Sequence, residues 1–505
     1  MNTAFLRLSG SLLALFLAAG CRTLPDLAER IPSAYIPTRS APHLEHALQL
    51  PPPPSAEADA HVRLLGNARD AFTARSRLID HAAVSLDVQY YIWRNDVSGS
   101  LLMRKLWQAA ERGVRVRVLL DDNNTRGEDA VWAALNGHRN IEVRLFNPFL
   151  YRKWRFLGYI GDFPRLNRRM HNKSLVADNR AAIVGGRNIG DEYFGNHADT
   201  VFADMDVLVS GEVVTRLSED FDRYWQSDSA YDLHTVVRSR PVAANRFTEP
   251  MTAAQQAYWQ GAEQAPLARA LRQKKLHYLT AQTQLVSDDP AKALNRHAVP
   301  SIGEHLDQAL KNPKKELYLV SPYFVPTPTG VAVLENFARN GVDVTVFTNS
   351  LRATDVAAVH SGYARYRKPL LQAGVKLYEF KPDHAVSKNQ DKGLTGSPAH
   401  SLHAKTFIVD KKRIFIGSLN LDPRSAHLNT EMGLVIRHPR LAEAMQQRLQ
   451  RAGGDAAYRV GLDGQGKMYW YDPATARAEH REPEAGFWKR WLSRILSVLP
   501  IERLL

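Results

Sequence analysis

Length, composition and charge exclude several classes of protein before any motif is considered. The chain has 505 residues, of which 44% are hydrophobic and 23% charged, as is ordinary for a globular protein of two or more domains. Its one cysteine, Cys21, rules out an intrachain disulfide, and its formal net charge of +14 indicates an anionic partner, either a phospholipid surface or nucleic acid, unless the basic residues are simply solvated.

Residues 1–20 have the pattern of a signal peptide. Arg7 supplies a positive charge, and residues 12–19 form an apolar run that is too short to span a membrane. Residues 17–21 resemble a bacterial lipobox, in which the cysteine is lipidated, so Cys21 is the predicted lipidation site; a cleaved signal peptide with an incidental cysteine is the alternative. We therefore expect a membrane-anchored lipoprotein of the bacterial cell envelope that faces the periplasm.

The segment after this cysteine is rich in proline. Residues 21–60 contain Pro25, Pro32, Pro37 and Pro42 and the run 51–54. Such a composition favours an extended, semi-rigid chain. We predict a tether that holds a catalytic body away from a lipid anchor.

The rest of the chain contains a repeat. In the first unit, 61–230, residues 84–92 and 114–120 have strand patterns and residues 99–112 a helical pattern between them. The second unit, 300–450, has the same order, with strands at 316–320 and 341–349 and a helix at 331–339. The strands that begin near Gly113 and Gly341 are offset by 228 residues, which indicates a duplication. This pattern predicts an α/β fold of two duplicated domains with mixed sheets covered by helices.

Two segments lie outside the repeat. Residues 231–299 lack strong strand signals and are predicted to be a connector, helical over 252–275. The tail, 451–505, is predicted to contain a hairpin at 458–471 and a helix at 487–499 with one apolar face and three cationic residues. This helix fits either a membrane interface or the surface of the second domain.

One motif occurs once in each unit. A histidine is followed by a lysine two residues later and an aspartate seven residues later, and an asparagine lies ten residues beyond the aspartate. The two sets are His171, Lys173, Asp178 and Asn188, and His403, Lys405, Asp410 and Asn420. Two copies at matching positions of a repeat are far more specific than one short pattern.

The residue types suit transfer of a phosphodiester. In an extended segment positions i and i+2 share a face, so each histidine and its lysine point to one site. Lysine ammonium groups can clamp phosphate oxygens. One imidazole can attack phosphorus while the other protonates the leaving oxygen and later takes a proton from the incoming hydroxyl. A zinc site is disfavoured, because lysine is a poor ligand and the body has no cysteine, and we predict no metal and no cofactor.

The paired motifs are similar to the HKD motifs of the phospholipase D superfamily, and the resemblance covers residues 60–450. It implies two phospholipase D-like α/β domains packed around one shared site, and a two-step transfer through a phosphohistidine. It also implies that His171 is the nucleophile and His403 the general acid and base, although the two could be reversed.

The same resemblance implies roles for the other site residues. The expected phosphate ligands are Lys173, Asn188, Lys405, Ser418 and Asn420. Ser418 follows the glycine of the second copy, whereas Gly186 stands at that position of the first. By position, Asp204 and Glu431 are expected to orient the two histidines. Asp178 and Asp410 belong to the catalytic motif, but we expect them to tie the motif strand to its turn.

A cluster of basic and aromatic residues precedes the first motif. Its members are Arg152, Lys153, Arg155, Arg165, Arg168 and Arg169, with Phe149, Tyr151, Trp154, Phe156 and Tyr159. The combination suits a phospholipid headgroup region, or equally nucleic acid, or a packed loop with a solvated face.

Within the superfamily, residues 89–96, residues 321–326, both motifs and the ending 499–501 resemble bacterial cardiolipin synthases of the C type. The implied reaction transfers a phosphatidyl group from phosphatidylglycerol or phosphatidylethanolamine to phosphatidylglycerol in a phospholipid membrane. A secreted phospholipase D that uses water, and a metal-independent nuclease, are the alternatives; a nucleic acid partner is not expected. An accessory protein and the oligomeric state stay open.

Overall fold

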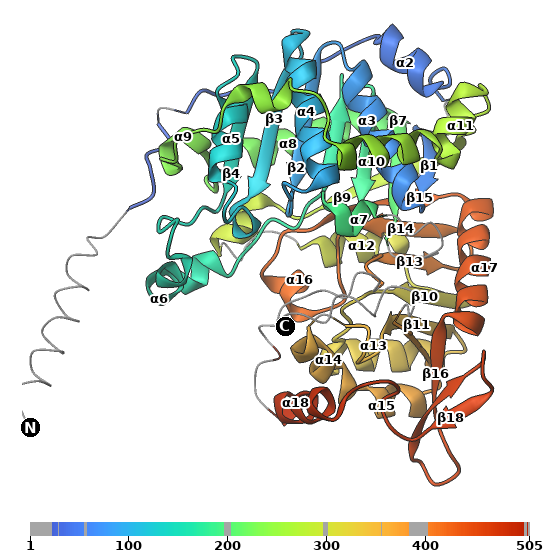
Figure 1. Ribbon diagram of the computed structural model, residues 1–505. Helices are drawn as coiled ribbons and strands as arrows, with labels where there is room; N and C mark the ends of the chain where they lie inside the picture. The colour runs from blue at the N-terminus through green and yellow to red at the C-terminus, as the bar shows by residue number, and fades with distance from the viewer. Residues whose placement is uncertain are drawn as a thin grey trace, which may run out of the picture.

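The computed structural model describes residues 23–28, 30–54, 58–195, 204–295, 301–354, 356–382, 402–498 and 502. The predicted signal peptide and Cys21 therefore lie outside the described residues. Two α/β halves are stacked on one another, the first blue to green and the second yellow to red in Figure 1. Both contain mixed sheets, as the sequence predicts.

The first half is built on eight strands whose order follows from their pairing. They are β1 (Ala60–Leu65), β2 (Ser85–Tyr90), β3 (Arg115–Asp121), β4 (Ile141–Phe146), β5 (Ser174–Ala177), β6 (Ala181–Gly185), β7 (Asp206–Gly211) and β8 (Ala230–Asp232). β2, β3 and β4 are parallel, and β5, β6, β7 and β1 continue the sheet antiparallel from β2. The apolar runs of β2 and β3 are buried on both faces, as expected for central parallel strands.

The second half repeats this arrangement. Its strands are β10 (Glu316–Val320), β11 (Asp343–Asn349), β12 (Lys376–Phe380), β13 (Thr406–Val409), β14 (Arg413–Gly417), β15 (Met432–Arg437), β16 (Ala457–Leu462), β17 (Met468–Asp472) and β18 (Arg477–Glu479). β10, β11 and β12 are parallel, and β13, β14 and β15 follow antiparallel from β10. The predicted hairpin exists, but it is part of this sheet because β16 pairs with β12.

Strand β9 (Leu279–Ser287) corrects the prediction that residues 231–299 lack strands. Its first residues pair antiparallel with β1, and residues 282–287 pair antiparallel with β15. One strand therefore joins the sheets of both halves. The predicted helix at 252–275 is present as two helices, α10 (Ala253–Glu263) and α11 (Pro266–Arg272).

Helices pack against the sheets of both halves (Figure 1). Those of the first half are α3 (Ala68–His81), α4 (Val97–Glu111), α5 (Asp129–Asn136), α6 (Arg155–Leu166), α7 (Asp191–Phe194), α8 (Glu212–Trp225) and α9 (Leu233–Val236). Those of the second are α12 (Ile302–Leu310), α13 (Thr327–Arg339), α14 (Ala357–Ala364), α15 (Arg367–Gln372), α16 (Pro423–His427), α17 (Pro439–Asp455) and α18 (Phe487–Val498). Apolar residues of α8 and α17 share one core with strands of both halves.

The prediction of an extended tether at 21–60 is wrong for much of its length. Arg30 donates to the carbonyls of Gln226, Ser227 and Ala230, so the segment is fixed to the first half. Residues Pro42–Leu48 form helix α2, whose Leu44 and Leu48 are fully buried. Proline at the first position of a helix is compatible with helix formation, which a reading based on proline content overlooks.

Candidate active site

Each motif histidine lies just before a short buried strand. His171 precedes β5 and His403 precedes β13. Since β5 runs antiparallel to β2, and β13 to β10, the histidines lie at the carboxyl ends of the parallel strands. That edge is where α/β sheets place their sites.

Each motif histidine contacts a carboxylate from the other half of the molecule. His171 Nδ1 lies 2.8 Å from Glu431 Oε2, and His403 Nδ1 lies 2.6 Å from Asp204 Oδ2. Asp204 and Glu431 thus contact the histidines as their positions suggest, but each carboxylate belongs to the opposite half. The backbone is joined as well, because His171 N–H donates to the Thr430 carbonyl at 2.9 Å. The site is therefore shared.

His171 occupies the more enclosed environment of the two. Its side chain is 9% exposed, and its ring packs edge-on against Tyr91 at 5.0 Å. Burial, reinforced by Lys173 and Lys405, lowers the pKa of His171 well below its ordinary value. Burial also raises the pKa of Glu431 to about 7, against the opposing effect of Lys173 and a hydrogen bond from Ser418. Near neutral pH this imidazole is neutral, as a nucleophile must be.

His403 is closer to solvent and has a firmly ionised partner. Its side chain is 25% exposed, and Tyr193 packs edge-on against its ring at 5.5 Å. Burial and Lys405 lower the pKa of His403 below its ordinary value, although Asp204 opposes that shift. Burial opposes ionisation of Asp204. The nearby His403 and Lys405 nevertheless hold the pKa of Asp204 below its usual range. An ionised carboxylate stabilises a protonated imidazole, which a general acid requires.

Both motif lysines are buried beside the histidines. Each Nζ donates to the backbone carbonyl of its own histidine, Lys173 to His171 and Lys405 to His403. Lys173 also lies 5.4 Å from the centre of the Tyr91 ring. Burial and Lys405 lower the pKa of Lys173, against the opposing effect of Glu431. Two ammonium groups held at one buried site form a ready receptor for an anion.

The two motif asparagines differ in their contacts. Asn188 Oδ1 accepts from the Ile92 N–H at 3.2 Å, so this side chain also ties the end of β2 to the motif. Asn420 is buried, and its Oδ1 has no hydrogen-bond partner. This unpaired amide oxygen can accept a hydrogen bond from a hydroxyl, but it cannot donate one to a phosphate.

Ser418 differs from its predicted role as a phosphate ligand. Its hydroxyl donates to Glu431 and accepts from the Met432 N–H at 3.0 Å, so its one proton is already engaged. In the first half Gly186 leaves room for the carboxylate itself, since a Cβ there would lie 2.1 Å from Asp204 Oδ1. The shorter aspartate accepts from its own neighbour, the Met205 N–H, at 2.7 Å. The exchange of glycine for serine at 186 and 418 therefore goes together with the exchange of aspartate for glutamate at 204 and 431.

The motif aspartates lie at the far end of the motif strands from the histidines. Asp178 accepts three backbone N–H groups from residues 83–85, and Asp410 accepts those of residues 314–316. These bonds fix the starts of β2 and β10 and lower the pKa of Asp410, although burial opposes that shift. Both carboxylates are therefore engaged by backbone groups at a distance from the histidines.

Most arginines of the basic cluster pair with aspartates of the protein. Arg152 pairs with Asp122 and Asp129, Arg155 with Asp122, and the buried Arg169 with Asp121. These pairs hold the segment before the motif against the end of β3. The aromatic residues of the cluster, by contrast, include several exposed ones on α6.

Sequence reasoning missed a buried support for Glu431. Asp288 Oδ2 accepts the Glu431 N–H at 2.9 Å and Lys292 Nζ at 2.8 Å, and Oδ1 accepts the Ile302 N–H at 2.7 Å. Lys292 also donates to the Ser425 carbonyl at 3.0 Å. The Asp-Asp pair at 288–289 before a proline indicates only a turn, so the sequence carries no signal for this contact.

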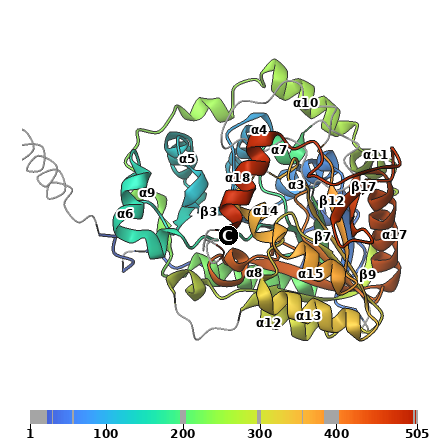
Figure 2. The ribbon, with the colours of Figure 1, turned by 90° about the horizontal axis from the view of Figure 1, so that it is seen from below.

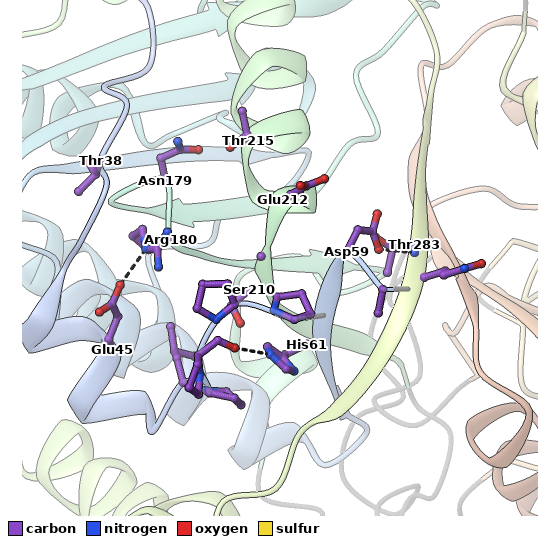
Figure 3. A pocket seen from close by; sticks show the side chains of 18 of the residues that line it. Thr38, Glu45, Asp59, His61, Asn179, Arg180, Ser210, Glu212, Thr215 and Thr283 are labelled. Atoms are coloured by element: carbon purple, nitrogen blue, oxygen red, sulfur yellow. Dashed lines mark hydrogen bonds and ion pairs between the residues drawn. The ribbon is translucent and has the colours of Figure 1, made fainter. Parts of the chain in front are cut away.

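A cavity of about 900 Å³ lies away from these residues (Figure 3). It is bounded by residues 51–54, β1 and the start of α8, and no motif residue lines it. Among its polar groups, Arg180 pairs with Glu45 at 2.8 Å, and His61 Nε2 lies 2.8 Å from the Pro52 carbonyl oxygen.

Comparison with known proteins gives one consistent picture. The family model described as cardiolipin synthase, PLD-like domain, matches residues 76–225 and 306–452. The chain is 47% identical over 453 residues to cardiolipin synthase C of Escherichia coli K12, covering 87% of this chain and 95% of that protein. It is 26% identical to a cardiolipin synthase of Geobacillus kaustophilus, covering 81% and 68%.

A solved structure shares the fold. The crystal structure of phosphatidylserine synthase from Haemophilus influenzae Rd KW20 superposes with a TM-score of 0.58 at 15% identity, over 92% of this chain and 99% of that one. Within the described part of the chain, no helix combines the length and the apolar character that crossing a membrane requires.

Proposed function

The chain belongs to the phospholipase D-like family of cardiolipin synthases, and on that premise we propose that it is a phosphatidyltransferase that makes cardiolipin. The observation that carries this proposal is the crossed pair of contacts, His171 with Glu431 and His403 with Asp204. They unite two histidines and two buried lysines in one site, as transfer of an anionic phosphodiester requires. The donor is phosphatidylglycerol or phosphatidylethanolamine, and the acceptor is phosphatidylglycerol.

In the first step of this mechanism, Nε2 of the neutral His171 attacks the phosphorus of the donor lipid. The bond from phosphorus to the headgroup oxygen breaks, and protonated His403 gives its proton to that oxygen. Nδ1–H of His171 donates to Glu431, whose negative charge balances the positive charge that develops on the phosphorylated ring. Lys173 and Lys405 neutralise the phosphate oxygens.

In the second step, His403 accepts the proton of the acceptor's glycerol hydroxyl. The hydroxyl oxygen attacks phosphorus, the phosphorus–nitrogen bond breaks, and His171 returns to its neutral form. Two features support this division of roles. The low pKa of His171 suits a nucleophile, and the ionised Asp204 beside the more exposed His403 suits an acid that meets the leaving and incoming groups.

We also propose that Cys21 carries the lipid that anchors the protein in the envelope, facing the periplasm. Arg30 is fixed on the first half, and nine residues span at most about 30 Å at roughly 3.5 Å per residue. The body would then stay close to the membrane surface rather than at the end of a long tether.

Product analysis tests the enzyme proposal. Purified protein is incubated with phosphatidylglycerol, with and without phosphatidylethanolamine, and the lipids are measured by mass spectrometry. We expect cardiolipin, and no turnover in the variants His171→Ala and His403→Ala. Formation of phosphatidic acid without cardiolipin would instead identify a hydrolase, and nicking of plasmid DNA in EDTA would identify a nuclease.

A further inference from the structure

Helix α18 shows its apolar side to solvent and its polar side to the protein. Trp488 is 73% exposed and Phe487 65%, and Trp491, Leu492 and Ile495 are exposed beside them. On the inner side, Ser493 is buried and Lys489 Nζ donates to the carbonyls of Arg352 and Thr354 at 3.3 and 2.9 Å. A helix that only covers a domain buries its apolar side. The exposed apolar side of α18 therefore indicates an interaction surface.

Helix α6 of the first half has the same character. Ile160 is 64% exposed and Phe156 58%, and Trp154, Leu157 and Phe163 are exposed as well. Its inward contacts include polar ones: Arg155 donates to the Asp122 carbonyl at 2.6 Å, and Tyr159 Oη donates to Asn123 Oδ1 at 3.2 Å. Two helices from different halves thus expose large apolar side chains in the same way.

Both helices are attached to loops that leave the carboxyl ends of the parallel strands, where the histidines lie. The residues that α6 contacts, Asp122 and Asn123, follow β3. Asn123 Nδ2 donates to Tyr91 Oη at 3.3 Å, and the Tyr91 ring packs on His171. The partners of α18 follow β11, whose Asn349 exchanges hydrogen bonds with Leu402, the residue before His403. Each helix therefore marks the rim of the site on its own half.

Figure 1 places α6 at the left, below the sheet of the first half, and α18 at the bottom of the molecule; in Figure 2, seen from below, α18 lies at the front. In both views the described residues of the N-terminal segment lie beside α6. The side of the molecule near α6 is thus also the side where the chain leads back toward Cys21.

The charges favour an anionic surface as the occupant. α18 contains Lys489, Arg490 and Arg494 and no acidic residue. Arg494 and Lys153, which adjoins α6, are exposed beside the aromatic side chains. Exposed tryptophan and phenylalanine with neighbouring cations are typical of segments that lie in the headgroup region of a bilayer.

We propose that α6 and α18 form a docking face that inserts its aromatic and aliphatic side chains into an anionic phospholipid bilayer and presents the rim of the active site to the headgroups. This inference rests on the proposed function, since it names the surface on which the phosphatidyl group is transferred. The two helices bind the same bilayer from the two halves, so each strengthens the attachment of the other.

The test uses the full chain with Cys21→Ser, so that no acyl chain contributes to binding. Sedimentation with vesicles of phosphatidylglycerol and phosphatidylethanolamine is compared for the unchanged docking face, Phe156→Ser/Ile160→Ser and Trp488→Ser/Trp491→Ser. Val333→Ser, an exposed apolar residue of α13, is the matched control. We expect each double variant to bind at least about tenfold more weakly, with the control unchanged and all melting temperatures close to that of the parent.

A second arm separates this inference from the proposed function. Turnover of lipid dispersed in detergent micelles should be the same in all these proteins, while turnover on vesicles should fall with binding. Unchanged vesicle binding in both double variants would overturn the docking face and leave the enzyme proposal intact. So would a parent protein that sediments as a dimer and becomes monomeric in the variants, since the face would then be covered by a second copy.

Discussion

At the scale of single residues, the two histidines share a motif but not a surrounding. His171 meets a glutamate whose second contact is Ser418, whereas His403 meets an aspartate that lies over Gly186. A glutamate is one methylene longer than an aspartate, and the neighbouring glycine or serine sets the space left for each carboxylate. The result is a neutral histidine on one side and a histidine beside a fixed negative charge on the other.

The pKa of Glu431 predicts that kcat/KM decreases on the acidic side of its pH profile. Burial raises this pKa to about 7, and only the ionised carboxylate can balance charge on His171. Because the group is protonated below its pKa, kcat/KM should fall as pH decreases through about 7. In Glu431→Gln this acidic limb should disappear and the plateau should drop by about 10⁴-fold, the order found when a catalytic histidine loses its orienting carboxylate. Initial rates across the pH range, with stopped-reaction lipid analysis, measure both.

An acidic limb that persists unchanged in Glu431→Gln would assign the titration to another group. Glu431→Asp is the companion variant, since it keeps the charge but withdraws it from the ring. Glu431→Asp should keep the acidic decrease in kcat/KM, with a lower plateau than the parent protein.

Gly186→Ser tests the space beside Asp204. A Cβ at this position would lie 2.1 Å from Asp204 Oδ1, so the carboxylate must move away from His403. We expect kcat to fall by about 10- to 100-fold, by the range that loss of a supporting contact costs at comparable sites, with little change in KM. Gly464→Ser, at a glycine with open space around it, is the control. Activity close to that of the parent would show that the two halves tolerate the same residue here.

The sequence predicts which residues meet in the candidate site but not all of their contacts. The duplicated motif places His171, Lys173, His403 and Lys405 together because strand periodicity and spacing are local properties. The crossing of Asp204 and Glu431 depends on how two distant sheets pack, which no local pattern encodes. The engagement of Ser418 by Glu431 depends likewise on a single side-chain contact inside that packed site.

At the scale of elements, the stretch after β9 supports the site from behind. Asp288 receives the Glu431 N–H, the Ile302 N–H and the Lys292 ammonium, and it is fully buried. Burial raises the pKa of Asp288, while Lys292 and the backbone donors oppose that shift. The connector thus positions the Glu431 carboxylate indirectly, because Asp288 holds the backbone of Glu431.

Asp288→Asn should be destabilising and should also slow the reaction. Leaving Lys292 buried without its ion partner costs about 3 kcal/mol of unfolding free energy, measurable by urea denaturation. Because Glu431 shifts with its backbone, kcat should fall while KM stays near its original value. The double variant Asp288→Asn/Lys292→Met should recover part of the stability without recovering kcat. Recovery of both would make the role of the pair purely structural.

The elements that the sequence predicts are those with strong apolar periodicity. β2, β3, β10 and β11 are largely buried, and valine or leucine recurs along each of them, so their patterns are plain. β9 has a Thr-Ala-Gln-Thr-Gln sequence and alternating exposure, so its strand conformation comes from the two neighbours it pairs with. Helix α2 was hidden by its prolines, although Leu44 and Leu48 have the spacing of one buried helical face.

At the scale of the whole molecule, the halves should unfold together. β9 is hydrogen-bonded to both sheets, and one apolar core includes strands from each half together with α8 and α17. Separate domains of this size commonly melt independently, but here each would expose the shared core. Differential scanning calorimetry should show one cooperative transition. Two well-separated transitions would mean that the shared strand and core contribute little to cohesion.

The crossed contacts have a consequence for how such a molecule can exist. A polypeptide holding only one half would lack the acceptor for its histidine until a second copy lay against it as a twofold dimer. Joining both halves in one chain replaces that concentration-dependent encounter with a fixed local concentration. It also removes the requirement that the two partners be identical. Asp204 with Gly186, and Glu431 with Ser418, could not coexist in a symmetric dimer; in a single chain each histidine can have its own partner.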